Sequence, residues 1–284
     1  MYAISPLRYP GAKWRLDEFV SAIIEDNGIS GGHYAEPYAG GASLALSLLF
    51  RERVAEIHLN DLDRSIWAFW KLAVEHSGEL IERVRETNVT IEEWYRQREV
   101  QKNKNSASVS DLGFSTFFLN RTNRSGIITG GVVGGKDQSG KWRIDARFNK
   151  PNLIRRLERI ASYRSRIHLT RLDALIFIAR RDKSLPPNRS LMYLDPPYFE
   201  KGKDLYMNAY QSEDHVVVAE AVLQQVKVPW IVSYDDAPKI REIYGDAHHI
   251  EYTLRYSASS TRRGQELMFL SPSLRTRNEL LLGA

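Results

Sequence analysis

An acid, two prolines and an aromatic residue, Asp195-Pro196-Pro197-Tyr198, follow directly on the apolar residues 191–194. Neither proline can donate a backbone hydrogen bond to a sheet, so a strand formed by residues 191–194 must end here. The Asp195 carboxylate and the Pro196 carbonyl are two neighbouring acceptors, and an exocyclic amine offers two hydrogens to such a pair. The ring of Tyr198 can stack on the flat base that carries the amine. The tetrapeptide therefore predicts a site for a nucleobase amino group, against the simpler interpretation of a turn at a strand end.

A glycine turn in "AEPYAGGAS" is the second feature that predicts a ligand. Gly40 and Gly41 let the backbone approach a ligand closely, and the helix expected from Ser43 to Phe50 presents its amino end there. The turn lacks the G-x-G-x-x-G pattern, and no Lys-Ser or Lys-Thr follows, which argues against a dinucleotide or a triphosphate. Asp61 ends the next expected strand about 20 residues further on, where a carboxylate accepts hydrogen bonds from ribose hydroxyls. The pair predicts recognition of an adenosine-like group.

The expected strands that carry these residues share one edge of a sheet. Each of four strand patterns ends in an acid or a glycine turn: "AEPYAGG", "IHLNDLD", "LTRLD" and "LMYLDPPY". In an open α/β sheet, ligands bind beyond the carboxyl ends of the strands. A single strand that ends in Asp is usually a turn or a helix cap, whereas four such ends predict a binding edge.

Strand and helix patterns alternate along the chain, which predicts an α/β fold with a Rossmann-like, doubly wound sheet. The alternation stops in the middle of the sequence. There, apolar residues recur at helical spacing from residue 65 to about residue 99, and a further helix is expected to end near Asn120. A glycine-rich segment follows as a long loop or hairpin. We therefore predict a sheet domain of residues 1–63 and 166–284 with an inserted helical and hairpin domain of residues 64–165.

The composition excludes several classes of protein. The 284 residues include no cysteine, so there is no disulfide, no thiolate metal site and no thiol nucleophile. No stretch approaches the roughly 18 apolar residues of a membrane-spanning helix, and the first residues lack the pattern of a secretory signal, so we expect a cytoplasmic protein. The net charge of +5 is mild, but basic residues are concentrated between Lys136 and Arg171. This predicts a phosphate-bearing partner, although "PNLIRRLERIASYRSR" alone also fits a solvated helix face.

Taken together, these motifs resemble the Dam-type (D12 class) DNA adenine N6-methyltransferases over nearly the whole chain. "LRYPGAKWRL" resembles the family's amino-terminal segment, with Tyr9 and Lys13 at its aromatic and lysine positions. "AEPYAGGAS" is similar to the family's glycine loop, E-P-F-x-G-x-G-S. "LNDLD" and "RLDALIF" place Asp61 and Asp173 at its two cofactor acids, and "DPPY" is its methyl-acceptor motif. "YSASSTRRGQELMFL" resembles its closing segment.

The resemblance implies a methyltransferase fold and a direct transfer of a methyl group from S-adenosylmethionine to N6 of an adenine flipped out of double-stranded DNA. It implies no metal, no membrane and no covalent enzyme intermediate. The catalytic residues would be Asp195, Pro196, Pro197 and Tyr198. The cofactor would be held by Tyr9, Lys13, Glu36, Pro37, Tyr38, Gly40, Asp61, Asp173 and Asp195.

The inserted domain departs most from the family pattern. The glycine loop has its second glycine one place early, at Gly41, and Lys13 follows Gly-Ala rather than Gly-Gly. "FFLNRTNRSGI" keeps the family's Asn-Arg turn, but the segment after it is longer than in the GATC-methylating members, so their target sequence is not carried over. The residues expected to contact DNA are Asn120, Arg121, Asn123, Arg124, Ser125, Lys136, Lys141, Arg143, Arg147, Arg262 and Arg263.

Other interpretations keep the same fold. RNA adenine, cytosine N4 or a protein glutamine amide could be the acceptor, but Asp195 argues against the glutamine enzymes, where Asn is expected, and against the cytosine enzymes, where Ser is usual. RNA is harder to separate because the acceptor chemistry is identical. A third interpretation is a catalytically silent nucleic-acid-binding relative. A cognate restriction endonuclease that acts separately and an association with the nucleoid through DNA are compatible with the resemblance.

Overall fold

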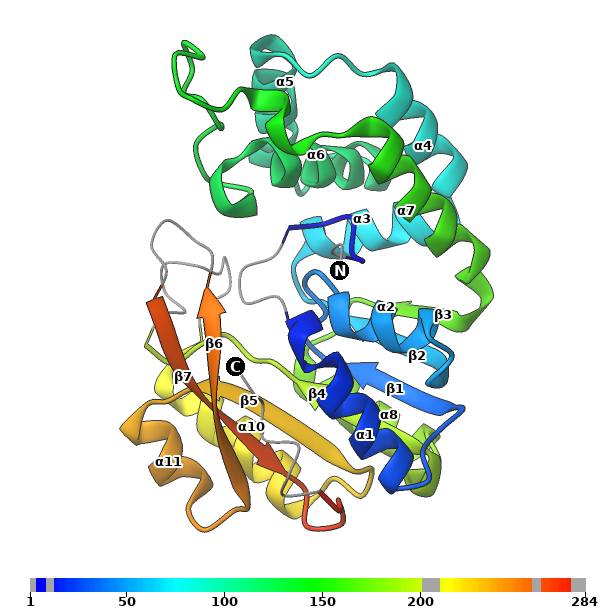
Figure 1. Ribbon diagram of the computed structural model, residues 1–284, viewed down its shortest axis with the longest axis vertical. Coiled ribbons are helices and arrows are strands. Elements are labelled where there is room, and N and C mark those ends of the chain that lie inside the picture. Colours follow the sequence, from blue (N-terminus) through cyan, green and yellow to red (C-terminus); the bar gives the residue numbers. More distant parts are fainter. Residues whose placement is uncertain (1–3, 9–12, 201–209, 257–261, 277–284) are drawn as a thin grey trace. The chain divides into compact units, whose positions relative to one another are not determined.

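Two compact units make up the computed structural model, which describes residues 4–8, 13–200, 210–256 and 262–276 (Figure 1). One, called the sheet unit here, comprises Lys13–Asp61 and Leu172–Ala284. The other, the helical unit, comprises Met1–Ala12 and Leu62–Arg171. Residues 64–165, the insertion expected from the sequence, fall within the helical unit.

A seven-stranded sheet has the strand order β3-β2-β1-β4-β5-β7-β6. Its strands are β1 (Gly32–Glu36), β2 (Val54–Asn60), β3 (Ile167–Thr170), β4 (Ser190–Leu194), β5 (Trp230–Asp235), β6 (His249–Tyr256) and β7 (Arg262–Leu270). β1 pairs in parallel with β2 and β4, and β4 pairs in parallel with β5. β7 is antiparallel to β5 and β6. The mostly parallel sheet confirms the predicted α/β fold class, and the antiparallel pair at one edge is a feature the sequence analysis did not identify.

Helices cover both faces of the sheet (Figure 1). On one face lie α1 (Asp17–Asp26), preceded by the short 3-10 helix η1 (Lys13–Leu16), and α2 (Ser43–Phe50). On the other lie α8 (Ala174–Ser184), α10 (Ser212–Gln224) and α11 (Pro238–Tyr244). Side chains of β4 and β5 pack with this second layer in one core cluster that includes Met192, Val232, Phe177, Val222 and Ile240. Both faces of β4 are therefore buried, which is why residues 191–194 are all apolar.

The helical unit is built around α6 (Val109–Thr122). Phe114, Phe117 and Phe118 of α6 are buried, and Phe117 stacks on Phe69 with ring centroids 5.9 Å apart. The surrounding helices are α3 (Arg64–Glu75), α4 (Ser77–Glu86), α5 (Ile91–Lys102) and α7 (Lys150–Ser162). The single helical region expected from residue 65 to about 99 is thus three helices. The chain leaves helical geometry at His76, and Thr90 caps the start of α5 by accepting the Glu93 N–H.

The glycine-rich segment between α6 and α7 contains two short 3-10 helices, η2 (Arg124–Gly126) and η3 (Ile144–Arg147). A single bridge pairs Asn123 with Val132. The segment is therefore a long loop rather than a regular hairpin. None of the described helices is long and apolar enough to span a membrane.

Candidate active site

The tetrapeptide Asp195-Pro196-Pro197-Tyr198 directly follows the central strand β4. β4 ends at Leu194, so the strand stops at Asp195 as the prolines predict. Ala35 of β1 lies opposite Met192 of β4, which brings the carboxyl ends of these two strands to one edge of the sheet. Asp195 and the glycine turn that follows β1 therefore belong to the same edge, where ligands of open α/β sheets bind.

Asp195 is held between a hydroxyl and an ammonium group. Its Oδ1 accepts a hydrogen bond from Ser233 Oγ at 2.8 Å and lies 3.2 Å from Lys13 Nζ. Burial raises the pKa of Asp195, while the positive charge of Lys13 and the Ser233 hydrogen bond oppose that rise. Its side chain keeps 24% of its surface exposed. The carboxylate is thus fixed in position, and its charged, hydrogen-bond-accepting form is favoured by a buried cation.

Lys13 is buried among acceptors. Its Nζ lies 2.9 Å from Glu266 Oε2 and donates to Tyr198 Oη at 3.2 Å, in addition to its contact with Asp195. Burial alone would lower the pKa of Lys13, but the negative charges around it, Asp195 foremost, hold that pKa well above its ordinary value. The lysine is therefore a permanent charge. Lys13, which is expected at the cofactor, contacts Asp195 and Tyr198 of the tetrapeptide.

Glu266 on β7 completes this network and was not singled out in the sequence. It is almost fully buried, accepts from Tyr198 Oη at 2.8 Å through Oε1, and accepts from the Tyr252 hydroxyl through Oε2. A buried acid needs such partners, because an unpaired charge away from water is costly. The available signal was an acid directly before the apolar residues 267–270.

The tyrosine of the motif is held by its hydroxyl rather than left loose. Tyr198 is 4% exposed, and Lys13 Nζ lies 5.3 Å from its ring centroid. The chain just after it is fixed by Asp235 at the end of β5, which accepts the backbone N–H of Phe199 at 2.9 Å and of Glu200 at 3.1 Å. Asp235 is a second positioning residue that sequence reasoning missed.

The glycine turn after β1 is closed by the acid at the end of β2. Asp61 Oδ2 accepts the backbone N–H of Gly40 at 2.9 Å. Gly40 has φ +45°, and Ala42 follows in the left-handed region with φ +44°. Alanine thus occupies a conformation that favours glycine, at the point where the second glycine comes one place early. The turn then enters α2, whose first residue is Ser43 as predicted.

Glu36, at the end of β1, is buried behind this turn. It accepts from the Tyr34 hydroxyl at 3.0 Å. Burial raises the pKa of Glu36 to about 8, against the opposing effect of the Tyr34 hydrogen bond, and the charge of Asp195 adds to the rise. A backbone hydrogen bond from Ala45 ties the same carboxyl to the first turn of α2. These contacts give Glu36 a role in positioning the turn.

Asn60 joins the turns that follow two different strands. Its Nδ2 donates to the carbonyl oxygens of Pro37 and Leu172, each at 3.0 Å, and its Oδ1 accepts the Leu172 N–H at 2.9 Å. The next residue, Asp173, caps α8 by accepting the Leu175 N–H at 2.9 Å. Asn60 was not predicted, yet it holds the expected cofactor residues Pro37 and Asp173 in place from one buried amide.

The chemistry of this edge fits S-adenosylmethionine. Backbone turns with no bulky side chain at Gly40 and Gly41, and acids after β2 and before α8, are suited to a cationic ligand with ribose hydroxyls and an adenine amine. Tyr38 adds an aromatic ring, which packs edge-on against Tyr210 with their hydroxyls 2.8 Å apart. Tyr9, also expected at the cofactor, lies outside the described residues.

The two asparagines expected to contact DNA are buried in the helical unit. Asn120 Oδ1 accepts the Arg8 N–H at 2.7 Å, and its Nδ2 donates to the carbonyls of Arg8 and Gly126. Asn123 accepts from Trp94 Nε1 at 2.6 Å and donates to two carbonyl oxygens of the following loop. Because their amides are engaged inside the protein, we do not retain them as base-reading residues. Here they position the loop.

Four arginines of the helical unit lie close together. Arg121 Nε donates to the Arg147 carbonyl at 2.7 Å, Arg8 Nη1 to the Asn123 carbonyl at 3.2 Å, and Arg156 Nη1 to the Ser5 carbonyl at 2.7 Å. The charges that act on Arg121 are all positive and come from Arg8, Arg156 and Arg147. Burial, together with these charges, lowers the pKa of Arg121 to about 9, so the group stays charged at neutral pH. We call Arg8, Arg121, Arg147 and Arg156 the arginine cluster.

Five more of the expected DNA contacts are on the loop between α6 and α7. Arg124, Lys136, Lys141 and Arg143 are exposed, and Ser125 is half-buried with φ +55°. Trp142, which the sequence analysis did not select, is 60% exposed, with Lys141 Nζ 5.8 Å and Arg147 Cζ 6.0 Å from its ring. The sequence feature that could have identified Trp142 as a DNA contact is an aromatic residue among basic residues. The side chains of Arg262 and Arg263 lie outside the described part of the chain.

One comparison with known proteins identifies a family. A family model described as D12 class N6 adenine-specific DNA methyltransferase matches residues 9–258. A comparison with curated proteins found no match. Among solved structures, a protein of Pyrococcus horikoshii proposed to be an RNA methyltransferase is similar at 9% identity, covering 89% of this chain and 81% of that one with a TM-score of 0.41. The rRNA methyltransferase AviRa of Streptomyces viridochromogenes is similar at 12% identity, covering 89% and 84%, with a TM-score of 0.38.

Proposed function

The chain belongs to the family of D12 class N6 adenine-specific DNA methyltransferases, and we propose that its catalytic edge is formed by Asp195 to Tyr198 together with the glycine turn after β1. The family uses S-adenosylmethionine, which supplies an activated methyl group on its sulfonium sulfur when bound. The observation that carries the proposal is the shared edge: β4, which ends at Asp195, pairs with β1, which leads into the turn closed by Gly40 and Asp61.

In the proposed reaction, Asp195 and the Pro196 carbonyl accept the two hydrogens of the adenine amino group. Holding both hydrogens draws N6 towards tetrahedral geometry, and its lone pair becomes available for attack on the methyl carbon. The N–C bond would form as the S–C bond of the donor breaks, the electron pair of that bond would stay on sulfur, and N6 would then release one proton to solvent. Lys13 favours the charged form of Asp195 that this role needs. Placement of the reactants and of charge accounts for the acceleration.

Tyr198 is proposed to stack on the extruded base. Adenine must leave the duplex because its amine cannot be reached inside the stack. The hydroxyl of Tyr198 is anchored to Glu266 and Lys13, which fixes the plane of the ring before any base arrives. A preset ring loses little freedom on binding, so more of the stacking energy remains as affinity.

Contacts to DNA are proposed for the arginine cluster and the loop around Trp142. Guanidinium groups bind phosphate in a bidentate manner, and those of the arginine cluster are surrounded by carbonyl oxygens and by one another in the described residues. A phosphate would relieve the repulsion among these cations, which adds to burial in lowering the pKa of Arg121. Trp142 offers a ring for stacking beside Lys141 and Arg147.

The test is transfer of a labelled methyl group from S-adenosylmethionine by the purified protein. Duplex DNA is compared with RNA of the same sequence, and the product nucleoside is identified. N6-methyladenine in duplex DNA is the expected product, and Asp195→Ala, with the same fold, is the expected inactive variant. Methylation of RNA alone would establish the RNA enzyme instead, and cofactor binding without any product would establish the silent relative.

The proposal also covers the location of the protein in the cell and a partner enzyme. We place the protein in the cytoplasm, associated with the nucleoid through DNA, and allow for a cognate restriction endonuclease that acts separately. Sequencing DNA from cells that express the chain, with detection of modified bases, gives the methylated sequence. A nuclease activity that cuts this sequence only when it is unmethylated would identify such a partner.

A further inference from the structure

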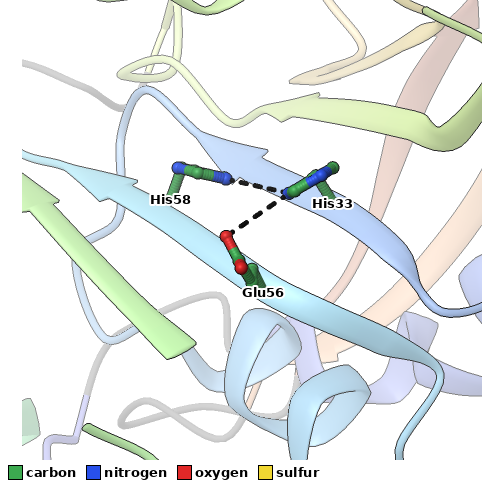
Figure 2. Close-up of side chains that lie close together, drawn as sticks. All are labelled: His33, Glu56 and His58. Atoms are coloured by element: carbon green, nitrogen blue, oxygen red, sulfur yellow. Dashed lines mark hydrogen bonds and ion pairs between the residues drawn. The ribbon is translucent and has the colours of Figure 1, made fainter. Parts of the chain in front are cut away.

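Three metal-ligating side chains gather on β1 and β2, away from the proposed active site. His33 is on β1, and Glu56 and His58 are on β2. His33 is paired with Glu56, and Ala35 with His58, in the parallel register of the two strands. Residues two apart on a strand share a face, so the three side chains lie on one side of the sheet. Figure 2 shows them turned toward one another.

The distances among their ligand atoms suit a single small ion. His33 Nδ1 lies 3.6 Å from Glu56 Oε2 and 3.4 Å from His58 Nε2. All three ligand atoms lie within 4.8 Å of one another. A tetrahedral Zn²⁺ with bonds of about 2.0–2.1 Å has its ligand atoms roughly 3.3 Å apart. The separations of 3.6 Å and 3.4 Å therefore match two edges of such a tetrahedron before any ion is bound.

We propose that His33, Glu56 and His58 form a binding site for one Zn²⁺ ion, at the end of the sheet away from the methyl-acceptor motif. This departs from the expectation of a protein without metal. Two imidazoles and one carboxylate are a ligand set of zinc proteins and leave a fourth position for water. Mg²⁺ and Ca²⁺ prefer ligand sets made of oxygen, so they should bind poorly here.

Burial and composition support an ion that enters from solvent. His58 is 4% exposed and provides a fixed anchor, whereas the side chains of His33 and Glu56 keep 28% and 38% of their surface exposed. An ion can thus reach the site past two of its three ligands. Because the sequence has no cysteine, no thiolate site in this chain competes for zinc.

The alternative is a group of side chains joined only by an ion pair and a shared proton. A hydrogen bond between His33 Nδ1 and His58 Nε2 requires a proton between the two nitrogens. Zn²⁺ would replace that proton, since metal binding to imidazole requires the unprotonated nitrogen. Binding should therefore release protons.

A bound Zn²⁺ ion is expected to cross-link β1 and β2. His33 lies three residues before Glu36, and His58 lies three residues before Asp61, which is about 10 Å along each strand. The ion would not contact the reacting groups, so its effect should be on stability. Binding to the folded chain alone stabilises it by mass action, and the melting temperature should rise with zinc concentration.

The test uses the full chain freed of metal with a chelator, titrated with ZnCl₂ by calorimetry. One ion per chain is expected, with proton release and a rise in Tm. Co²⁺ in place of zinc should give the visible absorption of a tetrahedral site. His33→Gln and Glu56→Gln, at the two more exposed ligands, should each bind at least about 10-fold more weakly and lose the rise in Tm. His76→Gln, at an exposed histidine of the helical unit, should match the original chain.

Binding of much less than one ion per chain, or an affinity that both ligand variants leave unchanged, would overturn the proposal. Circular dichroism of the metal-free variants checks that they remain folded, so a loss of binding reports on the ligands. The readouts are binding and melting temperature, and neither depends on methyl transfer. The zinc site can fail while the proposed function stands, and the reverse also holds.

Discussion

Lys13 in the sheet unit is buried and Arg121 in the helical unit is half-buried, but their neighbours are opposite in charge. Lys13 contacts the carboxylates of Asp195 and Glu266, and its pKa is raised. Arg121 is surrounded by other guanidinium groups, and its pKa is lowered. The charge of Lys13 is balanced by these carboxylates without a ligand, and it favours the ionised form of Asp195. The arginine cluster gains stability when an anion arrives, which is what a DNA phosphate provides.

This contrast predicts that the two regions affect different steps. Asp195→Ala should reduce kcat by about 10³-fold, the scale of losing a positioned acceptor in a reacting site, while DNA affinity changes little. Folding should persist because Lys13 keeps Glu266 as its counter-charge. Single-turnover methylation and DNA binding by anisotropy measure the two effects. Asp195→Asn, which keeps the shape but removes the charge, is the matched control. If Asp195→Ala turned over at a rate close to that of the original chain, Asp195 would not be a catalytic residue.

The charges around Asp195 predict shifts of the acid limb of the rate–pH profile. The limb marks protonation of Asp195, whose pKa burial raises, Lys13 lowers and Glu266 raises. Removing the cation with Lys13→Met should therefore move the limb to higher pH, by about one to three units. Removing the neighbouring negative charge with Glu266→Gln should move it to lower pH. Shifts of both variants in the same direction would show that Asp195 is not the titrating group.

The arginine cluster predicts a loss of DNA affinity without a loss of stability. Arg121→Gln should weaken binding about 10-fold and reduce the salt dependence by roughly one phosphate contact. Because it removes one of several like charges, the free energy of unfolding at low salt should stay the same or rise. Lys102→Ala removes an exposed cation that is already paired with Glu99. It should change neither the DNA affinity nor its salt dependence. Unchanged affinity and salt slope for Arg121→Gln would place the DNA contact elsewhere.

Local patterns predicted the sheet and the position of the Asp195–Tyr198 motif. Buried parallel strands have apolar sequences, and these sequences end at the polar residues of the site. Residues 191–194 form β4, and Asp195 follows it as expected. The edge strand β6 was harder to find. It has a neighbour on one side only, and in "HIEYTLRY" polar residues alternate with apolar ones. That period of two is the signal that would have located it.

Partners from distant segments could not be predicted from one sequence. Glu266 meets Lys13 across 253 positions, and Asn120 meets Arg8 across 112. A polar residue is equally consistent with a surface contact and with a buried hydrogen-bond network until its burial is known. For this reason Asn120 and Asn123 were assigned to DNA, while Arg8 and Asn60 were overlooked. Gly126 is fixed by such a distant contact. It has φ +77°, and a Cβ there would lie 2.3 Å from the Arg8 carbonyl oxygen.

Trp142 tests whether the helical unit binds DNA by charge alone. Trp142 is 60% exposed, and Lys141 Nζ and Arg147 Cζ lie 5.8 Å and 6.0 Å from the centroid of its ring. If a base stacks on it, Trp142→Ala should weaken DNA binding about fivefold, which corresponds to ~1 kcal/mol, the lower end for stacking of one base on an aromatic ring. Unlike Arg121→Gln, the change should leave the salt slope as it was, because no phosphate contact is lost. Trp142→Phe should retain most of the affinity. Tyr95→Ala, at another exposed ring of the same unit, provides the control. Equal losses at Trp142 and Tyr95, or a salt slope reduced as in Arg121→Gln, would mean that the ring only supports its charged neighbours.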